Sequence, residues 1–553
     1  MKVIGLATSL NHDDTRAMSS SSDPGFRWWH LLTRYQWFVL IVAALGWLLD
    51  CMDQQLFNLA RVPAMKELLK AQFGTAPTSA QVSEHAGYAT AVFLIGWATG
   101  GLFFGVLGDR WGRAKTMLVT ILMYSGCTGL SAFATQFWDF ALYRFITGLG
   151  VGGEFAVGVA LVAEVMPERA RPYALSLLQA LSTVGNITAA ATSIALGQLE
   201  ATGVLGQFLH WSAWRWMFIV GAVPALLVVL VRRKLKEPEA WKQLAAQTES
   251  RKKLGDYGEL FGNPNWRTPA AIAGGLLLTG ILLAFLGPVA WSNHLVFPGF
   301  SQLKLIVAGF AVAALGAGLW CVFGGGGDTT YRKRAVVGLL LALAGVIGVW
   351  GIAFFSFDLV RSVLEQKFKA EGFTGSELQG KLTFWAGITS MVQNLGAFFG
   401  IYAFGLLAQR TGRKPAFAVS FVVAMLSVAA TFWFLHDFWG IFLLVPVMGF
   451  GTLSVFGGYA IYFPELFPTR LRSTGTSFCY NVGRFVAACG PALLGLLTGV
   501  VFKDTATAAD ASLPLRYAGI TMCAVYFLGL IALPFAPETK GQPLPESDQG
   551  FAH

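Results

Sequence analysis

The chain has 553 residues, of which 55% are hydrophobic and only 13% are charged, and its mean hydropathy is +0.58. Because a soluble globular protein carries about 25% charged residues, this composition argues against a soluble fold and makes the bilayer the expected solvent. The net charge of +10 would suit a nucleic-acid binder, but the basic residues lie in short loops between apolar runs, as the positive-inside rule describes. The six cysteines lie in or beside apolar runs without a CxxC pair, so neither a disulfide framework nor a metal site is predicted.

The first half of the chain contains apolar runs close to the roughly 20 residues that a spanning helix needs. Residues 1–34 precede them and lack the sustained apolar core of a signal peptide. This segment is predicted to be a disordered cytoplasmic terminus, with Met18 as an alternative start. The N-terminal bundle, residues 35–231, is predicted to contain the helices Gln36–Ala60, Gly87–Leu107, Thr116–Thr135, Phe140–Val165, Tyr173–Leu199 and Trp216–Val231.

Residues 232–268 are rich in Lys and Arg and are expected to form a solvated cytoplasmic linker. Two extra apolar runs follow within residues 269–323, and an even number of added helices leaves the orientation of the second half unchanged. A C-terminal bundle (residues 324–536) and a cytoplasmic tail (537–553) complete an all-α membrane protein of about 14 spans, two six-helix pseudo-repeats plus two inserted helices. The runs are Pro269–Trp291, Leu303–Phe323, Ala335–Val360, Leu382–Ala408, Pro415–Leu435, Ile441–Phe463, Thr474–Val501 and Tyr517–Ala536.

The distribution of basic residues supports this topology. With the predicted helices, the clusters of Lys and Arg fall on one side, which is then the cytoplasmic side and holds both termini. Leaving out one of the two extra helices would place half of the clusters outside. The clusters are Arg110, Arg113 and Lys115; Arg169 and Arg171; the linker; Arg332, Lys333 and Arg334; Arg410, Arg413 and Lys414; and Arg470 and Arg472.

Two short motifs of the first half recur in the second half. The loop GVLGDRWGRAK at Gly105–Lys115 returns as GLLAQRTGRK at Gly405–Lys414. An offset of about 300 positions shared by two independent motifs indicates a duplicated chain built from parallel repeats. The second motif is the set Glu164, Pro167, Arg169 and Arg171, which returns as Glu465, Pro468, Arg470 and Arg472.

The GxLxDRxGRxK loop, its weaker copy and the closing run Pro537-Glu538-Thr539-Lys540-Gly541 resemble the major facilitator superfamily from about Tyr35 to Leu544. The resemblance implies secondary transport by alternating access in the plasma (inner) membrane, and we expect a monomer without a cofactor. The run Leu49-Asp50-Cys51-Met52-Asp53 and the segment RFITGLGVGGE resemble elements of proton-coupled symporters. YNVGR resembles an element of organic-acid and sialic-acid transporters, and the extra helices resemble the layout of bacterial sialic acid transporters.

Ionisable groups inside a bilayer are expensive, so each is a functional candidate. Asp50 and Asp53 share one face of the first helix, and two nearby carboxylates disfavour simultaneous ionisation, which is one way to build a proton site. Asp53 could instead face the outer vestibule as a helix-end residue. Arg144 and Glu154 are also proton-coupling candidates, but they lie about 15 Å apart along the fourth helix and do not pair directly. The alternative for Arg144 is a structural bond to backbone carbonyls.

Arg484 lies near the middle of the Thr474–Val501 run, where a guanidinium can bind a carboxylate through two hydrogen bonds. The alternative is a buried ion pair with an Asp or Glu of the other half. Neutral polar groups that interrupt apolar helices are candidates for the substrate cavity, although interhelical hydrogen bonding is their commoner use. They are Tyr480, Asn481, Gln393, Asn394, Gln179, Asn186 and Tyr459.

The repeated loops suggest a gate. Asp109, Arg110 and Arg113 can form charge-assisted contacts at cytoplasmic helix ends, and contacts made in only one conformer would act as a gate. Because Gln409 replaces the aspartate in the second copy, the gate is expected to be stronger on the first-half side; alternatively, the loops only anchor the topology. The candidate gating residues are Gly105, Asp109, Arg110, Gly112, Arg113, Glu164, Arg169, Gln409, Arg410, Arg413, Glu465 and Arg470.

The sequence therefore predicts proton-driven uptake of a small carboxylate: a monocarboxylate, an aromatic acid or a sialic acid. The expected partners are an anionic small molecule, protons and the bilayer. The predicted seventh helix, GVWGIAFFSFDLV, lacks the paired glutamines of sugar porters, so a neutral sugar is the second hypothesis and drug:proton antiport the third. A membrane sensor would be expected to carry a long cytoplasmic tail. An enzyme is disfavoured because no nucleophile–base set, metal spacing or phosphate loop is found.

Overall fold

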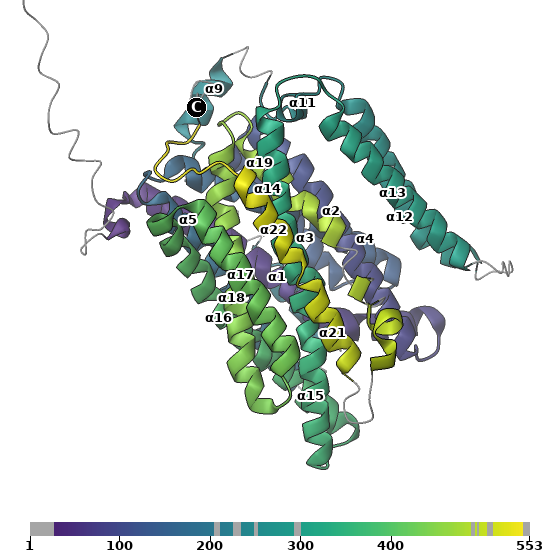
Figure 1. Ribbon diagram of the computed structural model, residues 1–553. Coiled ribbons are helices and arrows are strands. Elements are labelled where there is room, and N and C mark those ends of the chain that lie inside the picture. Colours follow the sequence, from purple (N-terminus) through teal and green to yellow (C-terminus); the bar gives the residue numbers. More distant parts are fainter. Residues whose placement is uncertain are drawn as a thin grey trace, which may run out of the picture.

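The computed structural model describes residues 27–203, 211–224, 234–247, 253–291, 300–487, 493–494, 497–505 and 512–545. Within these ranges every regular element is a helix, and most helices run side by side in one elongated bundle (Figure 1). The predicted all-α fold is confirmed. Predictions for the first 26 residues and for the end of the tail lie outside the described residues.

The N-terminal half contains α1 (Arg34–Phe73), α2 (Ser79–Trp111), α3 (Arg113–Ser131), α4 (Phe137–Val165), α5 (Arg171–Ala201) and α7 (Ala213–Gly221). α1 begins with a capping box, in which Thr33 and Gln36 exchange side-chain to backbone hydrogen bonds, and it ends at Gly74 with a φ of 71°. The segment between the predicted helices Gln36–Ala60 and Gly87–Leu107 is therefore mostly helical rather than a loop. Hydropathy locates the edge of the membrane, whereas these caps locate the ends of the helices.

The C-terminal half contains α14 (Thr330–Ile347), α15 (Ser356–Ala370), α16 (Gly375–Thr411), α17 (Arg413–Phe434), α18 (Phe438–Leu466), α19 (Arg472–Ala487), α21 (Leu513–Met522) and α22 (Val525–Ala532). Between α14 and α15 the chain widens into a π-helical turn, η3 (Gly348–Ile352), followed by a 3₁₀ turn, η4 (Ala353–Phe355). π turns inside helices are frequent at functional sites. This one places Val349, Trp350 and Ala353 on the cavity described below.

The linker is partly packed rather than solvated. It contains α9 (Glu239–Ala246) and α11 (Tyr257–Phe261), and the side chains of Leu254, Tyr257, Leu260 and Phe261 are buried. The backbone N–H of Gly255 donates to the carbonyl of Arg470 (2.9 Å), which ties the segment to the second half. The expectation of a solvated segment was wrong for this part, because the many Lys and Arg residues of the linker obscured a short apolar cluster.

The two extra helices are α12 (Arg267–Trp291) and α13 (Phe300–Phe323), which pack on each other and stand as a pair beside the main bundle (Figure 1). Nine helices within the described ranges are long and apolar enough to cross a membrane, and this pair is not among them. The predicted total of about 14 spans is therefore not confirmed. The nine are Arg34–Phe73, His85–Trp111, Phe137–Val165, Arg171–Glu200, Thr330–Ile352, Gly380–Thr411, Arg413–Phe434, Phe438–Leu466 and Leu513–Phe535.

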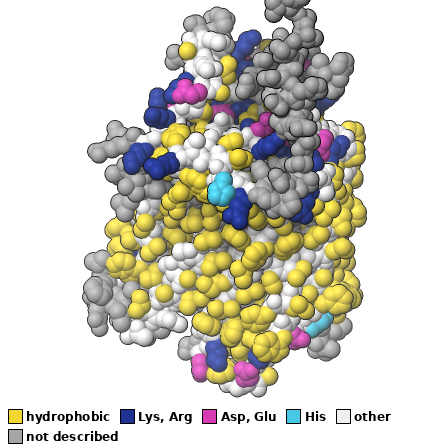
Figure 2. All heavy atoms as spheres, turned by 90° about the vertical axis from the view of Figure 1, so that its left-hand side faces the viewer, with side chains coloured by type: hydrophobic (Ala, Val, Ile, Leu, Met, Phe, Trp, Pro, Cys, Tyr) yellow, Lys and Arg dark blue, Asp and Glu magenta, His cyan; other side chains and the backbone are white. Residues whose placement is uncertain are grey.

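The surface of the bundle matches a membrane environment. Figure 2 shows a broad belt of hydrophobic side chains, with most of the visible Lys and Arg side chains above it and a few charged groups below. A contiguous apolar surface of this extent is not expected in water. The belt therefore marks the part of the molecule that faces lipid, and the linker helices lie at one end of it.

Candidate functional site

A cavity of about 120 Å³ lies between the two halves. α1, α2 and α5 supply its wall from the first half, and η3, α16, α18 and α19 are among the elements that supply it from the second. Six aromatic side chains contribute to the wall: Trp47, Trp97, Trp350, Phe357, Phe456 and Tyr480. Among the described residues, Arg484 is the one charged side chain in the lining. A mainly apolar wall with a few polar groups is typical of small-molecule sites.

Arg484 is held against two aromatic rings. The centre of its guanidinium lies 3.9 Å from the ring centroid of Trp97 and 4.2 Å from that of Tyr480. One terminal nitrogen, Nη1, donates to the carbonyl of Tyr480 (2.5 Å) and to Oδ1 of Asn481 (3.3 Å). Its Nε is buried without a hydrogen-bond partner, as are the indole Nε1 atoms of Trp47 and Trp97. The residues at this part of the cavity therefore carry three unsatisfied N–H donors, which an anion could satisfy.

Uncharged amides line the rest of the cavity. Asn186 of α5 donates to Oδ1 of Asn394 of α16 (2.8 Å), and Gln55 of α1 donates to the hydroxyl of Ser390 of α16 (3.1 Å). Gln179 has a buried side-chain oxygen without a partner, and Gln393 also contributes to the lining. These groups can fix a ligand, and two of them also join the halves at the level of the cavity.

Three carboxylates lie buried behind the cavity. Asp50, Asp53 and Glu154 are at most 1% exposed, so Asp53 does not face the outer vestibule. Both carboxylate oxygens of Glu154 and one oxygen of Asp50, Oδ1, lack hydrogen-bond partners. Gly46 makes room for Glu154, since a Cβ at Gly46 would stand 2.2 Å from its Oε1. Unsatisfied carboxylates at this depth are candidates for groups that bind protons.

Arg144 approaches Asp53 rather than Glu154. Its Nη1 lies 3.8 Å from Oδ2 of Asp53, and its Nη2 donates to the hydroxyls of Ser131 (2.8 Å) and Thr128 (3.1 Å) of α3. The structure therefore separates the acidic residues into Asp53, which has a cation beside it, and the pair Asp50 and Glu154 nearer to the cavity. The bonds to backbone carbonyls that were the alternative for Arg144 are replaced here by bonds to hydroxyls.

The first-half loop joins the two halves at one end of the bundle. Asp109 accepts hydrogen bonds from the backbone N–H groups of Ser473 (3.2 Å) and Thr474 (2.8 Å) and from the Thr474 hydroxyl (2.6 Å). These are donors in the first turn of α19, so Asp109 caps a helix of the other half. Arg113 donates to the carbonyl of Thr469 (2.6 Å), and Glu164 accepts from Arg113 (3.0 Å) and Arg472 (2.8 Å).

The ion pair of the second-half loop lies within its own half. Arg413 forms a two-pronged pair with Glu465, with Nη2 to Oε1 at 2.7 Å and Nε to Oε2 at 3.1 Å. Thr539 also donates to Glu465 (2.5 Å). The remaining predicted cations bind elsewhere, since Arg470 pairs with Glu259 of the linker (2.5 Å) and Arg110 donates to the carbonyl of Leu254 (3.0 Å). Both loops pass close to a facing helix at a glycine, Gly105 beside Ser477 and Gly405 beside Ser176.

Two predicted substrate residues do not line the described cavity. Tyr459 is fully buried and donates to the carbonyl of Leu341 (2.6 Å), so it joins α18 to α14. Asn481 is also fully buried; it donates to the carbonyl of Gly152 (3.2 Å) and accepts from Arg484, so it positions Arg484. Interhelical bonding, the alternative for such groups, applies to both. Arg484, Tyr480, Gln393, Asn394 and Gln179 do line the cavity.

Several site residues were not found from the sequence. Trp47, Trp97 and Trp350 were not singled out because an aromatic residue in an apolar run carries no signal of which face it occupies. Glu237 was missed although a signal existed, since its distance from Glu538 along the chain equals the offset between the two copies of the repeated motifs. Glu237 accepts from the N–H groups of Ala114 and Lys115 (both 3.1 Å) at the start of α3, as Glu538 does at the start of α17.

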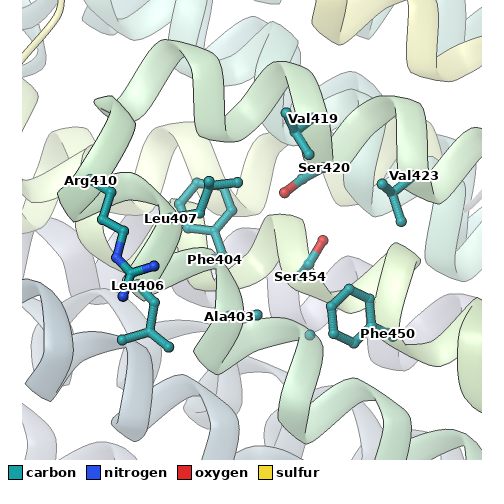
Figure 3. A pocket seen from close by; sticks show the side chains of 11 residues that line it. Ala403, Phe404, Leu406, Leu407, Arg410, Val419, Ser420, Val423, Phe450 and Ser454 are labelled. Carbon is teal, nitrogen blue, oxygen red and sulfur yellow. The ribbon is translucent and has the colours of Figure 1, made fainter.

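A larger hollow of about 340 Å³ lies outside the central cavity, within the C-terminal half. Figure 3 shows its wall of apolar side chains, with Ser420 and Ser454 facing each other and Arg410 at one end. α16, α17 and α18 supply the whole lining, so this hollow is not shared between the halves. Alternating access requires a site that both halves contact, and the central cavity meets that requirement.

Comparisons with known proteins agree with this geometry. The model of the "Major Facilitator Superfamily" matches residues 43–364, more than half of the chain, and the model "Sugar (and other) transporter" matches residues 337–489. The chain therefore belongs to the major facilitator superfamily, and it is a multi-pass membrane transporter rather than an enzyme.

Relatives cover nearly all of the chain. A putative metabolite transport protein of Haemophilus influenzae is 28% identical, with 92% of this chain and 98% of that protein covered. A probable 4-methylmuconolactone transporter of Cupriavidus pinatubonensis is 26% identical, with 92% of each chain covered. The solved structure of the proton:xylose symporter XylE has a TM-score of 0.61 at 18% identity, covers 92% of this chain and 98% of its own, and supports the fold alone.

Proposed function

We propose that this protein takes up a small carboxylate together with protons by alternating access. The observation that carries the proposal is the buried guanidinium of Arg484 in the cavity wall, whose Nε lacks a hydrogen-bond partner, as do the indole N–H groups of two tryptophans in the same lining. A charge in a low-dielectric site needs a partner, and a carboxylate can accept from a guanidinium through two parallel bonds. No carboxylate within the described residues lies at ion-pair distance from Arg484, and Asp50 of the other half acts on it only over a longer range, which leaves room for the carboxylate of a substrate.

Unsaturated and aromatic acids are the substrates to test first. The cavity wall is rich in aromatic rings, against which a planar acid can stack. Relatives include the probable 4-methylmuconolactone transporter and a cis,cis-muconate transport protein of Acinetobacter baylyi, which is 26% identical over 83% of this chain. A sialic acid transporter of Escherichia coli is 24% identical over 85% of this chain, so sialic acid stays on the list.

Asp50, Asp53, Arg144 and Glu154 are the proposed proton-coupling residues. Asp50 and Glu154 are buried, and Oδ1 of Asp50 and both carboxylate oxygens of Glu154 lack hydrogen-bond partners, so both carboxyl groups have room to bind a proton. Proton binding would neutralise the pair nearest to the cavity and so permit an anion to enter beside it. The proposed location is the inner membrane, with both termini and the linker on the cytoplasmic side and a monomer as the working unit.

A sugar is the second candidate. It is favoured by the match to the sugar transporter model over residues 337–489 and by the amide groups of Gln179, Gln393 and Asn394 in the lining. Amides can hydrogen-bond sugar hydroxyls, whereas a neutral sugar would leave Arg484 without an anion.

The deciding experiment is uptake into proteoliposomes with an inward proton gradient, with and without an uncoupler. Benzoate, protocatechuate, cis,cis-muconate, lactate, sialic acid and glucose would be compared. We expect uncoupler-sensitive uptake of at least one acid. Uptake of glucose alone would refute the carboxylate proposal and make Gln179, Gln393 and Asn394 the better candidates for substrate ligands.

The variant Arg484→Lys sharpens this test. An ammonium group cannot reproduce the planar fork of a guanidinium, so the apparent KM for the acid should rise about tenfold or more. Arg516→Lys is the matched control, because Arg516 is equally buried but binds the carbonyls of Phe432 and Leu435 outside the cavity. An unchanged KM in Arg484→Lys would rule out the carboxylate clamp.

A further inference from the structure

Gln54 connects a buried carboxyl group to the cavity. It stands one helical turn after Asp50 on α1, and its Nε2 donates to Oδ2 of Asp50 at 3.3 Å. Gln54 belongs to the cavity lining, whereas Asp50 is fully buried behind it. The other oxygen of Asp50, Oδ1, has no partner. Within the described residues, the hydrogen bond from Gln54 is therefore the direct polar link between Asp50 and the wall of the cavity.

A side-chain amide has two chemically different ends, an NH₂ group that donates and an oxygen that accepts. An ionised carboxylate only accepts, so it holds the NH₂ end, which is the arrangement observed. A protonated carboxyl group carries an O–H donor, which the oxygen end of an amide can accept. Turning the amide over would satisfy the protonated form and would direct the NH₂ group away from Asp50.

We propose that Gln54 is a positioning residue that couples substrate binding to protonation of Asp50 by turning its amide over. This inference rests on the proposed carboxylate transport. With Asp50 ionised, the amide oxygen lies on the cavity side, where it repels a carboxylate. With Asp50 protonated, the NH₂ group lies there and donates to the carboxylate, beside Arg484. Proton and anion then bind more tightly together than apart, and by linkage each strengthens the other equally.

Other charged and titratable groups face Asp50 from the packed helices. Asp53 lies on the same helix, Glu154 on α4 and Arg484 on α19. Cys51 of α1, Tyr124 of α3 and Tyr480 of α19 also lie within electrostatic range of it. Of this group, Cys51, Tyr480 and Arg484 line the cavity. None of these three is a neutral amide that can exchange a donor for an acceptor at the same place, which is why the coupling is assigned to Gln54.

The test is the pH dependence of substrate affinity in the full-length protein. The apparent KM is measured by counterflow in proteoliposomes with equal pH on both sides, at acidic and at alkaline pH. The probe is whichever of benzoate, protocatechuate, cis,cis-muconate and sialic acid the wild-type protein exchanges fastest. The wild-type KM should rise with pH as Asp50 loses its proton. In Gln54→Met the ratio of alkaline to acidic KM should fall about tenfold.

Gln55→Met is the matched control, because Gln55 lines the same cavity but bonds Ser390 instead of Asp50. It should change KM by one factor at both pH values and keep the wild-type ratio. The amide of Gln54→Asn is too short to reach both Asp50 and the cavity. Its ratio of alkaline to acidic KM should therefore fall as it does in Gln54→Met. A wild-type ratio in both Gln54 variants would overturn the inference while leaving the proposed function intact.

Asp50→Asn gives an independent check. An amide at position 50 cannot ionise, so the part of the pH dependence of KM that comes from Asp50 should be lost, and adding Gln54→Met to Asp50→Asn should leave the remaining alkaline-to-acidic ratio unchanged. A ratio that changes again in the double variant would show that Gln54 acts through another group and would overturn the inference. If the wild-type protein exchanges none of these four acids, nor lactate, at either pH, the proposed carboxylate transport fails, and the inference fails with it.

Discussion

The two copies of the repeated loop form the same hydrogen bond and ion pair within each half, but they differ where the halves meet. In both copies an arginine after the loop glycine donates to the carbonyl five residues before it, Arg113 to Gly108 (3.0 Å) and Arg413 to Ala408 (3.2 Å). In both copies the same arginine pairs with a glutamate near the end of a helix of its own half, Arg113 with Glu164 of α4 and Arg413 with Glu465 of α18. Each copy also has one serine contact across the halves, Ser477 to Gly101 and Ser176 to Ile401.

The helix cap across the halves exists in only one copy. Asp109 accepts from the Ser473 and Thr474 N–H groups at the start of α19, whereas the equivalent positions at the start of α5 are Pro172 and Tyr173. Proline has no N–H to donate, and Gln409 brings no negative charge to the positive end of a helix. The two copies therefore differ both in the residue that could accept the hydrogen bonds and in the residues that could donate them. We propose that the first loop governs opening of the bundle at this end, while its copy mainly holds its own half rigid.

The largest expected effect comes from comparing Glu164→Gln with Glu465→Gln. Glu164 neutralises two buried arginines, and one of them, Arg472, belongs to the other half. Removing its charge should destabilise the joined cytoplasmic ends by about 3 kcal/mol, or roughly a hundredfold in the ratio of closed to open molecules. The measurement is hydrogen–deuterium exchange of the segment that contains Ser473 and Thr474.

Glu465→Gln is the matched control because its hydrogen bonds to Arg413 and Thr539 stay within the second half. It should lower the thermal stability of the protein without faster exchange at Ser473 and Thr474. Equal acceleration in both variants would contradict the functional difference between the copies.

A smaller effect is expected from Asp109→Ala against Gln409→Ala. Loss of an N-cap costs about 1 kcal/mol, and Asp109→Ala also removes a buried ion pair with Arg113 (3.0 Å), so opening at the start of α19 should become at least about fivefold more frequent. Gln409→Ala removes no capping bond among the described residues and should leave opening unchanged. The rate at which a thiol reagent added on the cytoplasmic side modifies a cysteine introduced at Ser477 reports the opening. A cysteine that reacts equally fast in both variants would argue that Asp109 only anchors the topology.

Part of this comparison could be predicted from the sequence. The shared offset of the motifs predicted the duplication, and Gln409 in place of an aspartate suggested that the first loop is the stronger one. The cap itself could not be predicted, because Asp109 and Thr474 lie far apart in the chain and no local pattern relates them. Arg484 was predicted to lie in the cavity because a charge deep in an apolar run has few other uses. The role of Trp97 beneath it depends on helix packing that hydropathy does not reveal.

The linker also shows that composition does not predict packing. Its many Lys and Arg residues predicted solvent exposure, yet Tyr257 is buried and donates to the carbonyl of Leu102 (3.0 Å). Average composition describes a whole segment, whereas packing is decided by the few apolar residues within it. Glu237, in contrast, could have been found, because its distance from Glu538 repeats the offset of the two motifs.

The smallest expected effect concerns these two glutamates, which cap the helices after the loops. Glu538 accepts from the N–H groups of Arg413 (2.9 Å), Lys414 (3.1 Å), Thr539 (3.0 Å) and Lys540 (3.0 Å), whereas within the described residues Glu237 accepts from the N–H groups of Ala114 and Lys115. Burial alone would raise the pKa of Glu538, but the N–H donors outweigh it and lower the pKa. Its carboxylate therefore stabilises the fold at neutral pH, and this stabilisation is lost as the pH falls through the lowered pKa.

At neutral pH, Glu538→Gln should cost about 1 kcal/mol of stability, and Glu237→Gln, with fewer donors, should cost less. Thermal unfolding in detergent measures both. Because a protonated Glu538 resembles glutamine, the deficit of Glu538→Gln should shrink as the pH is lowered below the ordinary range of a glutamate. A deficit that stays constant down to that pH would mean that Glu538 acts through its shape and not through its charge, and the two caps would then be equivalent.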